Sequence, residues 1–271
     1  MAKEDLAPKI FVDSIKTYFS DRSYALIYTL PLATIILLFA IISIYTPQVI
    51  KSLLQPNLER LRDTLDAALT ILPVIVLDWI VSIVAASAVI VKVSREAEGE
   101  RYSVTESIGE GLSFLPRLVG AFFICLIITL SVFLPAIFLI IYGILTKSFI
   151  LIPVSLLLLL ILIFPAIYIG LRLSLYQQTC IIRDKGTIDC LKESWRITKG
   201  NLLFIFILLI FIMILYFVTS IVGDILSVFS KEIGFITNLS LSTILVAPIH
   251  IIALTKAFLE IAGTQPFSTS S

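Results

Sequence analysis

Six long apolar segments constrain this chain more than any other feature of its sequence. Each is long enough to cross a bilayer, because hydrocarbon about 30 Å thick needs roughly 20 helical residues at a rise of about 1.5 Å per residue. The segments do not alternate between apolar and polar residues, as the strands of a membrane barrel do. The sequence therefore predicts an all-α, polytopic membrane helix bundle. We expect its six transmembrane helices near residues 24–46, 69–92, 117–142, 148–172, 201–222 and 234–256.

The chain is predicted to form one membrane domain flanked by short segments. We expect residues 1–23 to form a cytoplasmic amphipathic segment, residues 24–260 the six-helix membrane domain, and residues 261–271 a cytoplasmic tail. The first apolar segment is too long for the core of a signal peptide, and acidic residues precede it. We therefore expect it to act as an uncleaved anchor.

The distribution of lysine and arginine predicts the orientation, because these residues are retained on the cytoplasmic side of a membrane. The larger set has fifteen members, Lys3, Lys9, Lys16, Arg22, Lys92, Arg95, Arg101, Arg117, Arg172, Arg183, Lys185, Lys192, Arg196, Lys199 and Lys256. The opposite set has five, Lys51, Arg60, Arg62, Lys147 and Lys231. We expect a multi-pass protein of the cytoplasmic (plasma) membrane with both termini in the cytoplasm.

The three cysteines are predicted to be free thiols. Cys180 and Cys190 fall in a loop that this orientation places in the reducing cytosol, and Cys125 falls inside the third span. The chain has a single histidine and no CxxC pair, so the sequence predicts neither a metal site nor a bound cofactor.

A short pattern recurs before the first, third and fifth spans. Its three occurrences are Asp13-Ser14-Ile15, Glu106-Ser107-Ile108 and Asp189-Cys190-Leu191, followed six residues after the acid by Phe19, Leu112 and Trp195. One hypothesis is a threefold repeat, in which each unit is a short amphipathic helix followed by two spans. The alternative is a chance similarity.

Two of these short segments carry their own helix signals. Ser103 and Glu106 form an S-x-x-E capping box, which predicts a helix start. In the third segment, Ile188, Leu191 and Trp195 form an apolar stripe and Lys192, Arg196 and Lys199 a basic one, before Gly200 ends the helix. Such a helix suits the membrane interface, where each basic residue near anionic headgroups gains about 1 kcal/mol. The alternative is that the apolar stripe packs under the bundle and the basic residues only set the topology.

The third segment also contains a dozen-residue motif. It reads Cys190-Leu191-Lys192-Glu193-Ser194-Trp195-Arg196-Ile197-Thr198-Lys199-Gly200-Asn201. It resembles the A-L-x-x-S-W-R-L-T-x-G-N signature of six-span prokaryotic membrane proteins, including YciC-like proteins and the membrane domain of some glycerophosphodiester phosphodiesterases. The resemblance implies a shared architecture and makes the matching residues of this interfacial helix candidates for a functional site. The catalytic barrel of the phosphodiesterases has no counterpart here, so we expect no such activity.

Two ionisable residues inside spans are further candidates, because placing one in hydrocarbon costs about 2.5–3.5 kcal/mol on insertion scales. Asp78, in the second span, could bind a cation or relay a proton, and His250, in the sixth, could titrate in a cavity. Each could instead form a helix–helix contact. By residue count the two lie about 12 Å apart in depth, so a direct pair is not expected. Arg172, at the inner end of the fourth span, is expected to extend to the headgroups.

Prolines within the spans predict helix kinks, because each removes a backbone hydrogen bond. They are Pro31, Pro73, Pro135, Pro153, Pro165 and Pro248. Broken helices line the binding sites of transporters, although proline is common in membrane helices generally.

No phosphate-binding loop, metalloprotease motif or nucleophile elbow appears in the sequence. We therefore expect a non-enzymatic membrane protein that organises lipid or partner proteins at the inner leaflet. Its expected partners are the lipid bilayer, including anionic lipids, and other membrane proteins, but not nucleic acid. The alternative is a small permease or accessory transport subunit that uses a kinked-helix cavity near Asp78 and His250. An intramembrane enzyme would need polar groups clustered at one depth, and the sequence shows only scattered ones.

Overall fold

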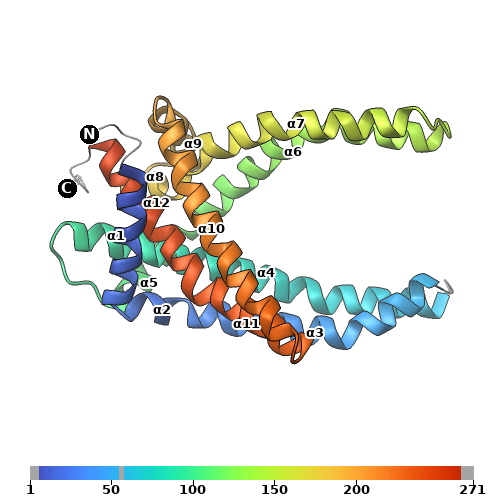
Figure 1. The fold of residues 1–271 in the computed structure, drawn as a ribbon, viewed down its shortest axis with the longest axis horizontal. Helices are drawn as coiled ribbons and strands as arrows, with labels where there is room; N and C mark the ends of the chain where they lie inside the picture. Colours follow the sequence, from blue (N-terminus) through green and yellow to red (C-terminus); the bar gives the residue numbers. More distant parts are fainter. Residues whose placement is uncertain (1–5, 55–57, 264–271) are drawn as a thin grey trace.

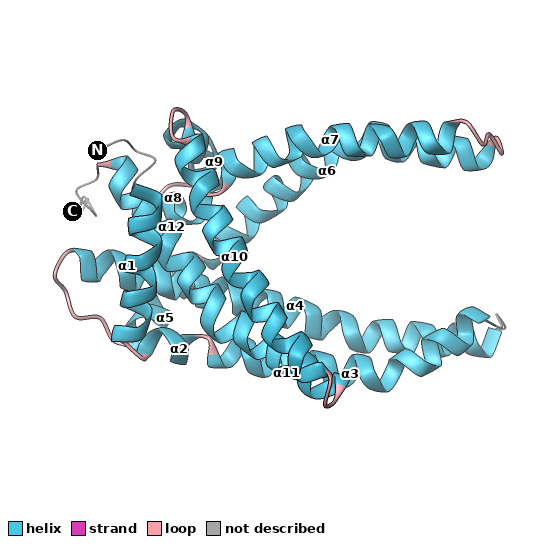
Figure 2. Ribbon diagram, viewed as in Figure 1, coloured by secondary structure: helices cyan, strands magenta, loops and turns pink. Residues whose placement is uncertain are grey.

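The computed structural model describes residues 6–54 and 58–263, which form helices joined by short loops and contain no strand (Figure 2). Six of the helical segments are long and apolar enough to cross a membrane. They are Ser23–Pro47, Thr64–Ala97, Leu115–Leu145, Leu151–Ile182, Leu202–Ser227 and Lys231–Ala262. The predicted all-α membrane bundle is therefore confirmed.

The helices follow one another as a short helix and then two long ones, three times over. The first set is α1 (Leu6–Ser20), the brief α2 (Ser23–Ile27), α3 (Thr29–Leu54) and α4 (Leu58–Ala97). The second is α5 (Val104–Ser113), α6 (Leu115–Leu145) and α7 (Leu151–Leu173), followed by the brief α8 (Tyr176–Ile182). The third is α9 (Thr187–Thr198), α10 (Leu202–Ser227), and α11 (Lys231–Leu241) continuing through a π-helical turn (Ser242–Val246) into α12 (Ala247–Ala262). This order agrees with the hypothesis of three units.

The short helices and the end of α12 lie at one end of the molecule (Figure 1). The α3–α4 and α6–α7 hairpins extend from that end as two separate arms, and α10 and α11 form a third hairpin that crosses the base of the α3–α4 arm in the view of Figure 1. Each short helix packs on the last long helix of the preceding unit: α5 on α4, α9 on α7, and α1 on α12. The short helices thus join the three units into a closed ring.

Residues that correspond in the three units occupy corresponding environments. The small residues directly after each acid, Ser14, Ser107 and Cys190, are all completely buried. The large apolar residues six positions after each acid, Phe19, Leu112 and Trp195, are all exposed, by 69%, 48% and 40%. A small side chain lets a helix approach its neighbour closely, which explains the buried position. Each short helix therefore has one face in the bundle and one large apolar side chain outside it.

The core lies at the end of the molecule that holds the short helices. The second half of α4, together with α8 and α12, contributes many of its fully buried side chains, including Ile90, Ile181 and Ile252. Away from the core, the α6–α7 hairpin is largely exposed, as at Leu134 and Leu160, which are 59% and 60% exposed. Such surfaces are stable against lipid tails, which are as apolar as leucine.

Several helix limits differ from the prediction. The first span is interrupted at Tyr28, between α2 and α3, and α4 is 40 residues long, so much of the loop predicted between the first two spans is helical. At the other end, α12 continues to Ala262, into the predicted tail 261–271, of which residues 264–271 lie outside the described part. Lys3 and the side chains of Lys51, Arg60 and Arg62 also lie outside it.

The six prolines occupy three kinds of position. Pro31 and Pro153 lie in the first turns of α3 and α7, where proline removes no helical hydrogen bond. Pro73, Pro135 and Pro165 lie inside helices that continue past them. Pro248 follows the π-helical turn, at the start of α12. The expectation that each proline removes a helical hydrogen bond is therefore wrong for the two in first turns.

The prediction of free thiols is wrong for two of the three cysteines. The structure joins Cys180, at the buried face of α8, to Cys190, on the buried face of α9, by a disulfide whose Cα atoms are 5.0 Å apart. Cys125 is a free thiol. The packing of α8 on α9 brings the two side chains together, and the reducing compartment expected from the orientation does not account for that proximity.

Candidate functional site

The predicted interfacial helix is α9, and it has a buried and an exposed face. Gly186 begins it in an extended conformation, and Gly200, just beyond its end, has a φ of +86°. Glycine adopts this left-handed conformation without strain, so the predicted stop at Gly200 is explained. The next residue, Asn201, is nearly buried and donates a hydrogen bond from its side-chain amide to the carbonyl of Ile197, at 3.0 Å. These contacts define where α9 ends and α10 begins.

The buried face of α9 is held on α7 through a backbone carbonyl. The Ser194 hydroxyl donates to the carbonyl of Arg172 at 3.0 Å, and the Thr198 hydroxyl is shared between the carbonyl of Ser194, at 2.9 Å, and that of Arg172, at 3.2 Å. Both residues are completely buried. An acceptor near the end of a helix lacks some of its helical partners, so these hydroxyls satisfy a group that would otherwise be unpaired. Two residues of the motif thus have a structural role in attaching α9 to the bundle.

The Arg172 side chain completes this attachment. It is only 8% exposed and donates to the hydroxyl of Tyr168, at 2.7 and 3.0 Å, and to the carbonyl of Trp195, at 3.3 Å. Its guanidinium carbon lies 5.1 Å from the Tyr168 ring centre and 5.2 Å from that of Trp195, within the range of a cation–π contact. The expectation that Arg172 extends to the headgroups is therefore wrong, because α9 covers it.

The exposed face of α9 combines apolar and basic side chains. Ile188 is 58% and Trp195 40% exposed. Lys192 and Arg196 have side chains 75% and 72% exposed, and Arg196 forms an ion pair of 2.7 Å with Glu193. Lys199, at the end of the helix, is also exposed. This face therefore offers apolar side chains and cations side by side.

Asp78 and His250 lie in different surroundings. Asp78, on α4, accepts a hydrogen bond of 2.7 Å from Thr34 of α3, so it contributes to the pairing of these helices. His250 lies on α12, beside the π-helical turn, and its buried Nε2 atom has no hydrogen-bond partner in the described part of the chain. No hydrogen bond or ion pair joins the two within that part. Neither residue lines the pocket between α1 and α12, the pocket between α7 and α10, or the pocket between α6 and α7.

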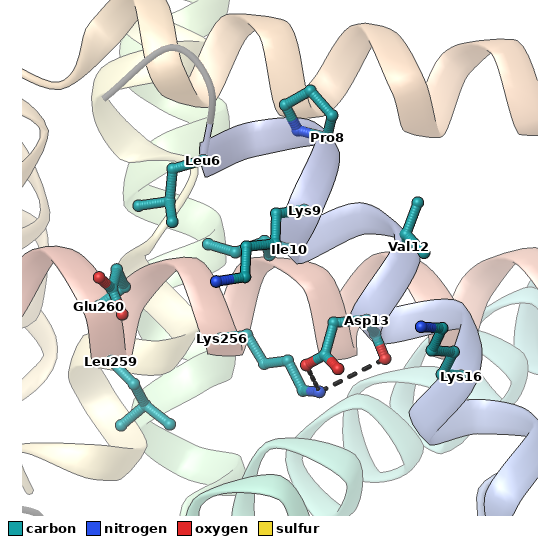
Figure 3. A pocket seen from close by; sticks show the side chains of 10 residues that line it. All are labelled: Leu6, Pro8, Lys9, Ile10, Val12, Asp13, Lys16, Lys256, Leu259 and Glu260. Atoms are coloured by element: carbon teal, nitrogen blue, oxygen red, sulfur yellow. Dashed lines mark hydrogen bonds and ion pairs between the residues drawn. The ribbon is translucent and has the colours of Figure 1, made fainter. Parts of the chain in front are cut away.

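A pocket of about 840 Å³ between α1 and α12 was not anticipated from the sequence (Figure 3). We call it the α1–α12 pocket. It is lined by Leu6, Pro8, Lys9, Ile10, Val12, Asp13, Lys16, Lys256, Leu259 and Glu260. From the sequence, its lysines were predicted only to set the topology. No sequence pattern indicated that the first and last helices pack together.

A buried lysine was also missed. Lys92 is 3% exposed and pairs with Asp21 at 3.0 Å and Glu96 at 2.8 Å, while its ammonium also donates to the carbonyl of Tyr102 at 2.8 Å. Burial raises the pKa of the Asp21 carboxyl. Hydrogen bonds from the backbone amide of Ser23 and from Lys92 lower this pKa by more, so it lies below its ordinary value. These contacts neutralise a buried charge and join α4 to the segments on either side, which indicates a structural role.

The described residues contain no group of three or more His, Cys, Asp or Glu side chains that could hold a metal ion. Residues 23–264 match a family model described as a domain of unknown function, DUF7847. The match covers most of the 271 residues. Comparison with curated proteins and with solved structures gave no match. The resemblance to YciC-like proteins stays a prediction.

Proposed function

The chain belongs to the DUF7847 family, and we propose that it is a non-enzymatic membrane protein that organises anionic lipid or partner proteins at the inner leaflet of a prokaryotic cytoplasmic membrane. The exposed face of α9 carries this proposal. Ile188 and Trp195 would be unfavourable in water, whereas Lys192 and Arg196 would be unfavourable in hydrocarbon. Only the boundary between acyl chains and headgroups suits both.

The other short helices support the same location. Val12 and Phe19 of α1 and Leu112 of α5 are 49%, 69% and 48% exposed, and these helices lie at the same end of the molecule as α9 (Figure 1). The short helices thus present exposed apolar side chains at one end of the molecule. With the excess of lysine and arginine at this end, we infer that the short helices and both termini face the cytoplasm.

Basic residues at this level favour anionic lipid. Each lysine or arginine close to a negatively charged surface contributes about 1 kcal/mol. Lys192 and Arg196 lie on one exposed face of α9, four residues apart, so both can reach headgroups together. The protein would then gather anionic lipid around the short helices, while the six spans hold it in the bilayer.

Lipid retention tests the proposal. Wild-type protein and the Lys192→Gln/Arg196→Gln variant would be reconstituted into bilayers of equal phosphatidylglycerol and phosphatidylcholine, extracted in mild detergent, and analysed by mass spectrometry for retained lipid. We expect the wild type to retain phosphatidylglycerol preferentially and the variant to lose much of this preference.

The matched control removes two charges from the opposite end of the molecule, as Lys147→Gln/Lys231→Gln. This variant should retain phosphatidylglycerol as the wild type does. Equal retention of the two lipids by the wild type would contradict the proposal, as would an equal loss in both variants.

The π-helical turn beside His250 favours a second candidate, a small permease or accessory transport subunit, because such turns often occur at functional sites. The carboxylate of Asp78 would then act on the solute or on a coupling ion. In that case Asp78→Asn abolishes flux into liposomes, whereas Lys192→Gln/Arg196→Gln leaves flux unchanged. If the wild-type protein mediates no flux, this candidate fails and the lipid-organising function stands.

A further inference from the structure

The α1–α12 pocket has a polar and an apolar side (Figure 3). Lys9, Lys16 and Lys256 line it, whereas Leu6, Ile10 and Leu259 supply apolar surface. Its volume of about 840 Å³ lies within the range of about 300–1,000 Å³ that is common for small-molecule sites. A molecule that fills this pocket must therefore be both charged and apolar.

The lysines differ in what they contact. Lys256 forms an ion pair with Asp13 and donates to the hydroxyl of Thr17 at 2.5 Å, so it holds α1 on α12. Lys9 and Lys16 are exposed and form no ion pair within the described part of the chain. The ammonium groups of Lys9 and Lys16, both on α1, are therefore available to an anionic ligand.

The net charge of the lining favours an anion. Three lysines face two carboxylates, Asp13 and Glu260, and one carboxylate is already paired with Lys256. Glu260 lies on α12, across the pocket from α1 (Figure 3). In Figure 3 the Lys9 amine points toward the Glu260 side of the pocket, and Lys16 lies beyond Asp13, about two helical turns along α1. A ligand with a negative charge between these two flexible lysine side chains matches this arrangement.

The position of the pocket indicates where such a ligand comes from. Its walls are α1, which precedes the first span, and the end of α12, which completes the last. Val12, at the pocket, and Phe19, two turns further along α1, are exposed apolar side chains that suit a bilayer surface. A molecule rising from the inner leaflet would meet the pocket with its headgroup.

We propose that the α1–α12 pocket binds the headgroup of a single anionic phospholipid, with its phosphate diester at Lys9 and Lys16 and its glycerol and first acyl carbons against Leu6, Ile10 and Leu259. This inference rests on the proposed location of the short helices at the inner leaflet. It adds a defined site to the general attraction of lipid by α9, so that one lipid would bridge the first and last helices of the bundle.

Titration with a soluble lipid tests the site. Dioctanoyl phosphatidylglycerol would be added to the full-length protein in detergent, with dioctanoyl phosphatidylcholine and inorganic phosphate as the comparison ligands, and bound ligand would be counted by native mass spectrometry. The test variant is Lys9→Gln/Lys16→Gln, which leaves Lys256 in place so that α1 stays attached. Its thermal unfolding must match that of the wild type.

We expect one phosphatidylglycerol to bind the wild type and the affinity to fall about 25-fold in the test variant, the equivalent of about 2 kcal/mol at about 1.4 kcal/mol per tenfold change. Phosphatidylcholine should bind weakly to both proteins, because its headgroup has no net charge. Inorganic phosphate should not displace the bound lipid, because it makes no apolar contacts.

The α9 variant Lys192→Gln/Arg196→Gln distinguishes a failure of the pocket assignment from a failure of the proposed function. If Lys9→Gln/Lys16→Gln binds phosphatidylglycerol as tightly as the wild type while the α9 variant loses lipid retention in bilayers, the pocket assignment is overturned and the function stands. Tight binding of inorganic phosphate that depends on Lys9 and Lys16 would overturn the lipid assignment in favour of a free phosphate. A wild type with no preference for phosphatidylglycerol in either assay would overturn both.

Discussion

The hydroxyl of Tyr18 donates a hydrogen bond to the carbonyl of Ile244, at 2.8 Å, and Tyr18→Phe removes that bond without changing the ring. The carbonyl is one that an α-helix would pair with the amide of residue 248, four positions later. Residue 248 is proline and has no amide hydrogen. Tyr18→Phe therefore removes the donor that α1 supplies to a carbonyl whose usual α-helical partner position is occupied by Pro248.

The expected cost follows from the burial of this contact. Tyr18 is 7% exposed, and burial raises the pKa of its hydroxyl, which keeps the group protonated as a donor. An unsatisfied buried acceptor costs about 1–3 kcal/mol, and interhelical hydrogen bonds in membrane proteins reach at most about 1.7 kcal/mol. We expect Tyr18→Phe to lower the free energy of unfolding by about 1–1.5 kcal/mol.

A double-mutant cycle with Pro248→Ala measures the coupling directly. Alanine restores an amide at position 248, so the carbonyl of Ile244 has a helical partner and no longer depends on Tyr18. In the Pro248→Ala background, we expect Tyr18→Phe to cost less than about 0.5 kcal/mol. The free energies would be measured by unfolding in mixed micelles, with Tyr142→Phe, on an exposed tyrosine of α6, as the matched control.

An equal cost of Tyr18→Phe in both backgrounds would refute the reasoning. It would mean that the hydroxyl stabilises the protein independently of Pro248. A cost no larger than that of Tyr142→Phe would show that the bond contributes nothing measurable.

Three further predictions concern other contacts. Gly111→Ala should destabilise the protein by about 1–3 kcal/mol, because a Cβ atom there would lie 2.8 to 2.9 Å from atoms of α4. Gly109→Ala should stabilise the protein by up to about 1 kcal/mol, because a Cβ atom there would have no neighbour within 4 Å. Thermal unfolding of both variants measures the two effects. Unfolded, unreduced protein should show one reactive thiol, that of Cys125, and three thiols after reduction; three before reduction would contradict the α8–α9 disulfide. Hydrogen bonds from Ser103 lower the pKa of Glu106. The stabilisation is therefore complete above the ordinary carboxyl pKa and lost in acid, so the melting temperatures of wild type and Glu106→Ala should differ at neutral pH and converge as the pH falls below that value.

Local features of the fold were predictable from short stretches of sequence. The six spans follow from apolar length, and the capping box of α5 forms as predicted, with Ser103 and Glu106 bonding each other's backbone amides. The end of α9 at Gly200 follows from the glycine alone. Each of these depends on residues within one or two helical turns, which is the range over which sequence patterns act.

The candidate site was predictable only in part. The motif indicated α9 and its basic stripe, but not that Arg172, more than twenty residues earlier, lies beneath Trp195. Nor did it indicate that Lys256 pairs with Asp13, which is separated from it by 243 residues. Such contacts depend on which helices become neighbours, and helical periodicity does not specify neighbours.

The sequence by itself determined that this chain is a bundle of apolar helices, because in hydrocarbon a helix satisfies every backbone amide and carbonyl within its own segment. It also determined the amphipathic short helices before each pair of spans. Only the tertiary structure decided which face of each short helix is buried. Packing against α12, α4 and α8 covers Ser14, Ser107 and Cys190 and leaves the large apolar side chains outside. The reason is that small residues permit close approach between helices, and the partner for that approach exists only once the helices have assembled.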